Sequence, residues 1–267
     1  IKEGEAFILA NIDGKKVAWN NPDAPVEISI PYKPTSEELI NNEHIVIWYI
    51  DGNGKVSTIT SGKYNVETGM VTFTTTHFST YAVSYVKKTF SDISNYGWAK
   101  KQIEVLASKG IISGKPNGQF DPGEDITRAD FILLLVKALG LTAEVNSNFA
   151  DVKPTDYYYE AVGIAKALGI TQGTGNNLFN PREFITRQDM MVLVNRSLML
   201  KNKITKPGNV STILKFSDAG KIAEYAKESI ANLVKEGIIV GNNNQINPSG
   251  HATRAEIAVV IYRIYNK

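Results

Sequence analysis

One pentapeptide occurs three times in this chain with little change. It reads ITRAD at 126–130, ITRQD at 185–189 and ATRAE at 252–256. The copies lie 59 and then 67 residues apart, counted between the central arginines (187 − 128 and 254 − 187). Self-similarity at such a period is the signature of a repeat architecture, in which one small unit is copied and the copies pack on one another. This part of the chain must therefore fold as three versions of one unit.

Other landmarks recur with the pentapeptide in the same order. Each copy opens with Phe-Ser-Asp or Phe-Ala-Asp and continues with an aromatic residue and a Gly-Ile step. A turn rich in glycine and asparagine follows and ends in proline, just before the pentapeptide. We assign the three repeats to residues 88–142, 147–201 and 214–267, within one repeat domain at 88–267.

Each repeat is predicted to form helix, loop and helix. In WAKKQIEVLASKG (98–110), apolar residues fall on one helical face, and Lys100, Lys101 and Lys109 are expected on the outside. Gly110 stands where a left-handed residue ends a helix. The second helix, DFILLLVKAL in the first repeat, is apolar on nearly every side and has to be buried. We expect the three second helices to share one central bundle.

The pentapeptide contains a helix-capping signal. A threonine followed three residues later by an acid, just before an apolar run, predicts a capping box, in which each side chain accepts from the other's backbone N–H. The pairs that fit it are Thr127 with Asp130, Thr186 with Asp189, and Thr253 with Glu256. The box does not explain the arginine between them, because a cation in the first turn opposes the helix dipole.

Arg128, Arg187 and Arg254 are therefore expected to have a use beyond capping. In one alternative, each guanidinium pairs with a carboxylate of a neighbouring repeat. The candidate partners are the aspartates that open the repeats, Asp92, Asp151 and Asp218. In the other alternative, each arginine faces a groove and binds an anion, helped by free N–H groups at the helix N-terminus. The two uses are not exclusive.

Residues 1–87 have a different composition from the repeats. Short runs rich in valine, isoleucine, threonine and aromatics alternate with turn pairs such as Asp13-Gly14 and Asp51-Gly52. We predict a small β-sandwich-like domain, so that the fold class is α+β with an all-β domain followed by an all-α domain. Asp51-Gly-Asn-Gly lacks the spacing of an EF-hand and is interpreted as a hairpin turn. His44 and His77 have no partners at ligand spacing and are interpreted as structural residues.

Several function classes are excluded or disfavoured by composition. A net charge of +2 gives no general attraction to nucleic acid, and the absence of cysteine excludes thiolate metal sites. No apolar run approaches the ~20 residues that span a bilayer. Motifs of zinc peptidases, serine hydrolases and phosphate-binding loops are missing. We therefore expect no catalytic residue, metal, cofactor or membrane insertion, and, because Ile1 is not an initiator residue, a piece cut from a longer protein.

The repeat landmarks together resemble the S-layer homology domain, in three tandem copies over 88–267. HFSTYAV at 77–83 also resembles the end of a small β-domain found ahead of such repeats in bacterial surface proteins. The resemblance implies a pseudo-threefold arrangement with the second helices at its centre. It implies non-covalent anchoring of an exported protein to the secondary polysaccharide of a Gram-positive-type cell wall, typically through a pyruvylated amino sugar. The expected location is extracellular, in the cell wall or S-layer.

The resemblance also assigns roles to residues of this chain. The arginines would meet the pyruvate carboxylate, the capping acids would shape the groove, glycines would let the backbone approach the sugar, and aromatics would form the groove wall. The residues in these roles are, in turn, Arg128, Arg187 and Arg254; Asp130, Asp189 and Glu256; Gly114, Gly173 and Gly241; and Trp98, Tyr157 and Tyr225. The opening aspartates Asp92, Asp151 and Asp218 complete the candidate site.

The three repeats depart unequally from the shared pattern. The second has Gln188 in its pentapeptide, and the third has a shorter turn with Ile246 in place of phenylalanine. We therefore expect unequal grooves, with the one around Arg128 ranked first, and we interpret His251 as a solvated loop residue. The alternative function is a protein–protein module, in which neighbouring S-layer protein copies are the partners of a surface lattice.

Overall fold

The computed structural model describes residues 5–7, 10–12, 15–17, 20–21 and 24–267. The predicted turn at Asp13-Gly14 lies outside these residues. The chain divides into two compact units. The β unit comprises residues 1–94 and 100–120, and the repeat unit comprises residues 95–99 and 121–267. The boundary predicted at 87/88 remains a prediction, but most of the first repeat's first helix groups with the β residues.

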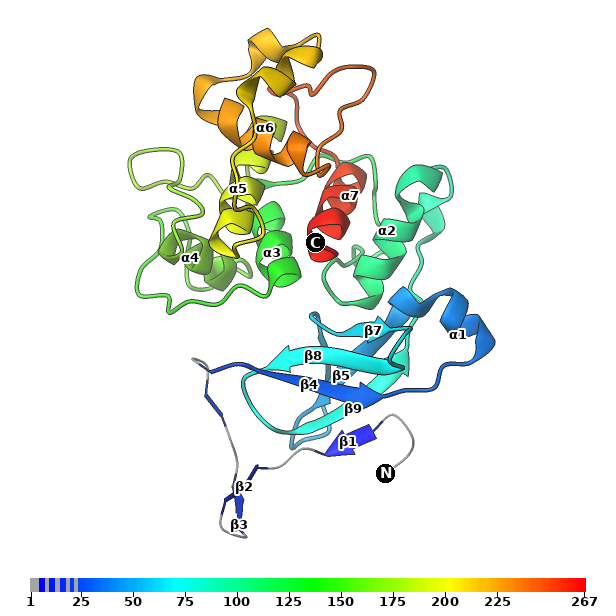
Figure 1. Cartoon of the computed structure of the whole chain (residues 1–267). Coiled ribbons are helices and arrows are strands. Elements are labelled where there is room, and N and C mark those ends of the chain that lie inside the picture. The colour runs from blue at the N-terminus through cyan, green and yellow to red at the C-terminus, as the bar shows by residue number, and fades with distance from the viewer. Residues whose placement is uncertain (1–4, 8–9, 13–14, 18–19, 22–23) are drawn as a thin grey trace. The chain divides into compact units, whose positions relative to one another are not determined.

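The β unit contains two antiparallel sheets, as the composition of residues 1–87 predicts (Figure 1). One sheet has the order β1 (Glu5–Phe7), β9 (Thr80–Tyr85), β5 (Ile45–Ile50) and β6 (Val56–Ile59). The other has the order β4 (Val26–Pro31), β8 (Met70–Thr75) and β7 (Lys63–Asn65). A separate two-stranded ladder joins β2 (Ala10–Ile12) to β3 (Lys15–Val17).

Both sheets contribute to one apolar core. Ile45 and Ile47 on β5 are two residues apart and therefore share a face, where they cluster with Val71 and Phe73 of β8. Tyr81 of β9 is fully buried in the same cluster and bonds the Thr75 side chain at 2.8 Å. The β character predicted for this region is confirmed.

A short helix in the β unit was not expected from the sequence. Helix α1 (Ser36–Ile40) leads into the 3₁₀ turn η1 (Asn42–His44). Thr35 and Glu38 form a full capping box, in which Thr35 N donates to Glu38 Oε2 at 2.8 Å and Glu38 N to Thr35 Oγ1 at 3.3 Å. The local signal Thr-Ser-Glu-Glu was therefore present in the sequence.

The expectation that Lys109 lies outside is wrong. Helix α2 (Gly97–Ser108) ends beside η1, where Ser108 Oγ lies 2.8 Å from His44 Nδ1. Lys109 is 2% exposed, and its Nζ donates to the carbonyl oxygens of Ile45 (2.5 Å) and Gly62 (2.7 Å). Burial, followed by repulsion from Lys63, lowers the pKa of Lys109 to about 7. A position that would be exposed in an isolated repeat is thus buried here, because the end of α2 packs against the β residues.

The repeat unit is helical, as predicted (Figure 1). Its helices are α3 (Arg128–Leu139), α4 (Tyr159–Ala167), α5 (Arg187–Leu200), α6 (Lys227–Lys235) and α7 (Arg254–Tyr265). Three 3₁₀ turns lie between α5 and α6, namely η3 (Val210–Lys215), η4 (Ala219–Lys221) and η5 (Glu224–Ala226), and η2 (Ser91–Ile93) opens the first repeat in the β unit. Helix α3 contacts both α5 and α7, so the second helix of the first repeat adjoins the second helices of the other two.

Backbone hydrogen bonds join the starts of these second helices in a closed order. Arg128 N donates to the Glu183 carbonyl, Arg187 N to that of Gly250, and Arg254 N to that of Glu124, each at 2.8 Å. The next residue of each helix donates to a neighbouring proline carbonyl in the same order, at 2.9–3.0 Å. Each repeat therefore supplies acceptors to the preceding one, and the first supplies them to the third. The free N–H groups expected at these helix starts are consumed by neighbouring repeats.

Candidate functional site

The three threonines of the pentapeptide cap their helices as predicted. Each hydroxyl accepts from the N–H of the acid three residues on, at 3.1 Å for Asp130, 3.2 Å for Asp189 and 3.3 Å for Glu256. The reciprocal bond exists only in the third repeat, where Thr253 N donates to Glu256 Oε2 at 3.0 Å. The prediction of a full box is wrong for the two aspartates, whose side chains are one methylene shorter and do not accept from the threonine N–H.

A tyrosine of the next repeat contacts each of these two aspartates. Tyr157 OH donates to Asp130 Oδ1, and Tyr225 OH donates to Asp189 Oδ1, both at 2.6 Å. Partial burial and then the hydrogen bond to Asp189 raise the pKa of Tyr225 to about 12. Partial burial and then the hydrogen bond to Asp130 raise the pKa of Tyr157 well above its usual value. Both hydroxyls therefore remain protonated donors at neutral pH.

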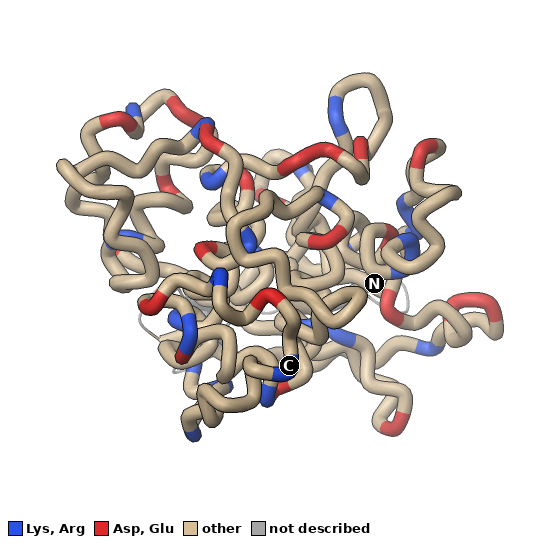
Figure 2. Tube along the Cα trace, turned by 90° about the horizontal axis from the view of Figure 1, so that it is seen from above, with Lys and Arg blue, Asp and Glu red and all other residues tan. Residues whose placement is uncertain are grey.

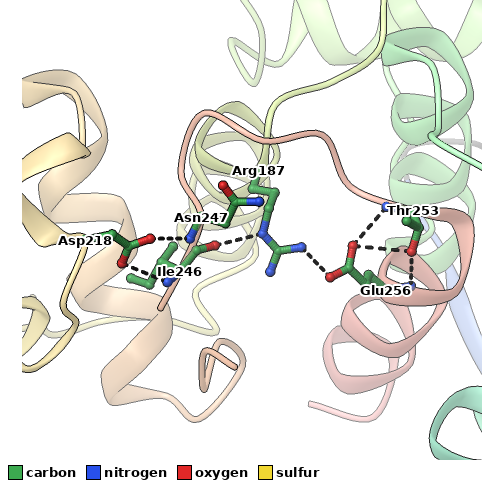
Figure 3. A network of polar contacts seen from close by, with 6 residues as sticks. All are labelled: Arg187, Asp218, Ile246, Asn247, Thr253 and Glu256. Atoms are coloured by element: carbon green, nitrogen blue, oxygen red, sulfur yellow. Dashed lines mark hydrogen bonds and ion pairs between the residues drawn. The ribbon is translucent and has the colours of Figure 1, made fainter. Parts of the chain in front are cut away.

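Arg128 and Arg187 reach across to the following repeat. Arg128 Nε donates to the Phe179 carbonyl at 3.0 Å, and its Nη1 lies 3.7 Å from Asp189. Arg187 Nε donates to the Ile246 carbonyl at 2.8 Å, and its Nη1 to Glu256 Oε1 at 2.7 Å (Figure 3). Desolvation lowers the pKa of Arg128, although an arginine stays charged at neutral pH. The carboxylates that these two guanidiniums meet are the neighbouring capping acids, and not the opening aspartates.

The opening aspartates instead hold the turns of their own repeats. Asp151 accepts from the N–H groups of Phe179 (2.9 Å) and Asn180 (2.7 Å). In the third repeat Asp218 accepts from Ile246 (3.0 Å) and Asn247 (2.7 Å), as Figure 3 shows. In the first repeat both carboxylate oxygens of Asp92 accept from Phe120 N, at 3.0 and 3.1 Å. These carboxylates thereby fix the carbonyls of Phe179 and Ile246, which Arg128 and Arg187 contact.

The turn glycines are required by packing within each repeat. A Cβ at Gly114 or Gly241 would lie 2.5 Å from the ring of the opening phenylalanine. At Gly173 it would overlap the Leu178 carbonyl oxygen and lie 2.7 Å from the Phe149 ring. Gly173 and Gly241 also have positive φ, +76° and +77°. The close approach of the turn backbone to the ring of the phenylalanine that opens each repeat therefore accounts for glycine at these three positions.

A cavity of about 410 Å³ lies within the repeat unit and brings four predicted site residues together. They are Trp98, Arg187, Gly241 and Glu256. The cavity is built around Arg187, whereas the sequence ranks the groove of Arg128 first.

The rest of the cavity wall is largely apolar, with one further cation. Met190, Val259 and Val260 contribute apolar surface. Arg263, which the sequence reasoning missed, also lines the cavity, and its Nη1 donates to the Ile238 carbonyl at 2.7 Å. Two guanidiniums and one carboxylate therefore face an aromatic and aliphatic wall, which suits an anionic ligand with apolar faces. A basic residue nine positions after each pentapeptide arginine was the signal available for Arg263.

Other classes of site find little support in the described residues. They contain no group of three or more His, Cys, Asp or Glu that could hold a metal ion. Burial lowers the pKa of His44, which bonds Ser108 as a structural residue. His251, interpreted as a solvated loop residue, is 45% exposed at its side chain and lies 3.1 Å from Asp125 of the first repeat. Along the described trace, basic and acidic residues are interspersed, unlike a basic nucleic-acid track (Figure 2).

The fold defines a helical repeat module, with a cavity lined by residues from all three of its repeats. The family model of the S-layer homology domain matches residues 89–132, 148–191 and 215–258. The chain therefore carries three S-layer homology domains, at the positions that the repeated landmarks predict.

Relatives of this chain include both enzymes and S-layer proteins. It is 35% identical to the amylopullulanase of Thermoanaerobacterium thermosulfurigenes over 245 residues, 91% of this chain and 13% of that protein. It is 32% identical to the surface-layer 125 kDa protein of Lysinibacillus sphaericus over 178 residues (65% and 14%). Identity to the S-layer protein sap of Bacillus anthracis is 31% over 181 residues (67% and 21%). The first match must extend into the β residues, because the repeats alone cannot supply 91% of the chain.

These relatives place the chain at the cell wall or cell surface. The chain spans between 13% and 21% of their lengths, so an enzyme name among them describes a protein of which this chain matches only a part. S-layer homology domains are non-catalytic modules, and the matches support cell-wall anchoring of surface proteins in general. No helix in the described part of the chain is both long and apolar enough to cross a membrane.

Proposed function

We propose that the three repeats hold a longer surface protein on the bacterial cell wall by binding an anionic secondary cell wall polysaccharide. The recognised unit is a pyruvylated amino sugar. The observation that carries this proposal is the cavity that Trp98 and Arg187 both line, with an otherwise largely apolar wall. The wall polymer is therefore the partner, and no catalytic step is involved.

The chemistry of the cavity supports a carboxylate on a sugar. Arg187 is held in place by the Ile246 carbonyl and by Glu256, and its remaining donors are available to a ligand. A ketal-linked pyruvate keeps its charge at physiological pH and fits the planar fork of a guanidinium. The apolar face of the sugar would pack on Trp98. Each charge-assisted hydrogen bond contributes about 1.5–3 kcal/mol, so one site is expected to bind modestly.

The proposal includes a pseudo-threefold arrangement with α3, α5 and α7 as its central bundle. It is supported by the contacts of α3 with α5 and α7 and by the closed order of backbone hydrogen bonds between the helix starts. In such an arrangement Arg128, Arg187 and Arg254 occupy equivalent positions. Their capping acids and turn glycines are then equivalent too, as candidate groove residues.

The proposed function is tested by calorimetric titration of the whole chain with a pyruvylated amino-sugar fragment and with the same fragment lacking pyruvate. We expect salt-sensitive binding that depends on pyruvate. Arg187→Gln should weaken it by about 10-fold to 100-fold, since it removes about 1.5–3 kcal/mol of charge-assisted bonding. Lys221→Gln, at an exposed lysine that is not among the cavity residues, is the matched control. Equal affinity for both fragments, or full affinity in Arg187→Gln, would contradict the proposal.

Arg187 also joins two repeats, so a second variant separates binding from stability. Arg187→Lys keeps the charge but cannot reproduce the forked contacts with Ile246 and Glu256. We expect a folded protein with affinity between those of the wild type and Arg187→Gln, while thermal unfolding shows that all variants remain folded at the titration temperature.

Self-association into a surface lattice is the second candidate function. It is favoured by the relatives named as S-layer proteins. Binding of the chain to cell wall stripped of protein would support anchoring. Retention that requires other copies of the chain would support the lattice instead.

A further inference from the structure

The aromatic residues at the starts of the first helices form a set of three. Tyr157 of the second repeat contacts the capping acid of the first, and Tyr225 of the third contacts that of the second. The remaining pair in this order is Trp98 of the first repeat with Glu256 of the third, and both residues line the cavity. Trp98, Tyr157 and Tyr225 are 55%, 69% and 58% exposed, so exposure does not distinguish them. The hydroxyl group does.

The hydroxyl changes what the acid contacts. In the two tyrosine positions, the phenol takes one carboxylate oxygen through a short hydrogen bond of 2.6 Å. Arg128 is correspondingly distant from Asp189, with its Nη1 at 3.7 Å. Tryptophan has no hydroxyl, and in its position Glu256 receives Arg187 at 2.7 Å. Of these two arginines, Arg187 is held closely by its acid, in the position of the tryptophan, and Arg128 is not, in the position of a tyrosine.

We propose that the aromatic residue at the start of each first helix decides which groove admits the ligand, an inference that rests on the proposed function. Tyr157 and Tyr225 each close a groove by donating a hydrogen bond to its capping acid, and we call this hydrogen bond a latch. Trp98 has no such bond to donate and leaves the groove of Arg187 open. The chain therefore binds one sugar unit, in the cavity of Arg187, and Trp98 is a specificity-determining residue. A ligand that entered a latched groove would first have to displace a hydrogen bond to a charged group, which lowers its affinity by about 10-fold to 100-fold.

Binding stoichiometry tests the latch, because a merely structural role would not change it. Calorimetric titration of the whole chain with the pyruvylated amino-sugar fragment should give one site for each wild-type chain. The double variant Tyr157→Phe and Tyr225→Phe keeps both rings and removes both latches, and we expect additional sites. Tyr64→Phe on β7 removes a hydroxyl in the β unit and should leave one site.

A second, independent test adds a hydroxyl where the structure has none. Trp98→Tyr introduces a hydroxyl opposite Glu256, and we expect it to weaken binding by about tenfold or more while thermal unfolding shows an intact fold. Two or three sites in the wild type, or one unchanged site in the double phenylalanine variant, would overturn the latch while leaving anchoring intact. The absence of any binding in every variant would overturn the proposed function itself.

Discussion

The free energy of unfolding of the β unit is expected to rise with pH between about pH 7 and pH 10, and Lys109→Met is expected to remove that rise. The cause is the buried Lys109 ammonium, whose pKa burial lowers from 10.5 to about 7. The folded chain therefore releases this proton near pH 7, whereas the unfolded chain keeps it to about pH 10.5. The unfolded state binds more protons within this window, so stability increases with pH there.

The size of the effect follows from the same linkage. The cost of burying the charge is fully present below pH 7 and is relieved as pH rises, at no more than about 1.4 kcal/mol for each pH unit. Two charged groups face Lys109 from the neighbouring elements. Lys63 on β7 repels the ammonium, and Glu43 in η1 attracts it and moderates the shift. The measurement is a series of urea titrations from pH 6.5 to pH 9.5, followed by a probe in the β unit.

The difference between variants isolates Lys109 from other groups that titrate in this range. Lys109→Met also loses the hydrogen bonds to the Ile45 and Gly62 carbonyls, which changes its stability at every pH. The quantity compared between variants is therefore the slope of the free energy of unfolding against pH. Lys100→Met, at an exposed position of α2, which ends just before Lys109, should keep the wild-type slope. A wild-type slope that persists in Lys109→Met would contradict the assignment of the titration to Lys109.

The repeats, their helices and their threonine caps could be predicted because these features are local. A capping threonine needs only the N–H three residues ahead, and a left-handed glycine such as Gly110, at φ +70°, ends a helix wherever the helix packs. The burial of Lys109 is different in kind. Its burial depends on the carbonyls of Ile45 and Gly62, which lie more than 40 residues away in sequence. No pattern within α2 shows that the end of this helix will pack against them.

The candidate site could be predicted in its residue types but not in its pairings. The sequence identifies Arg187 and Glu256 as special, yet it offers the opening aspartates as the arginine's partners. The actual choice depends on the offset between repeats, because each helix start bonds the following repeat and carries its arginine toward that repeat's acid. The opening aspartates were already occupied by local N–H groups such as those of Ile246 and Asn247. Contacts across an interface between repeats are set by packing, which a single sequence does not display.

Alanine substitutions at two glycines of the second repeat are expected to separate the cost of backbone strain from the cost of steric overlap in the free energy of unfolding. Gly169 and Gly173 have nearly equal positive φ, +70° and +76°, but their surroundings differ. Nothing lies within 4 Å of a Cβ at Gly169, so Gly169→Ala should cost only the left-handed conformation, about 1–2 kcal/mol. At Gly173 a Cβ would overlap the Leu178 carbonyl oxygen, which belongs to the backbone and cannot move aside as a flexible side chain would.

Gly173→Ala should therefore cost about 3 kcal/mol or more in the free energy of unfolding of the repeat unit, since overpacking adds about 1–3 kcal/mol to the conformational strain. The rigid aromatic ring of Phe149, at 2.7 Å from the same Cβ, leaves no second route for relaxation. Phe149→Leu in the Gly173→Ala background should recover only part of the loss, because the carbonyl overlap remains. Equal destabilisation by Gly169→Ala and Gly173→Ala in urea titrations would mean that positive φ alone, and not the approach of the opening ring and the turn backbone, requires glycine at this position of the repeat.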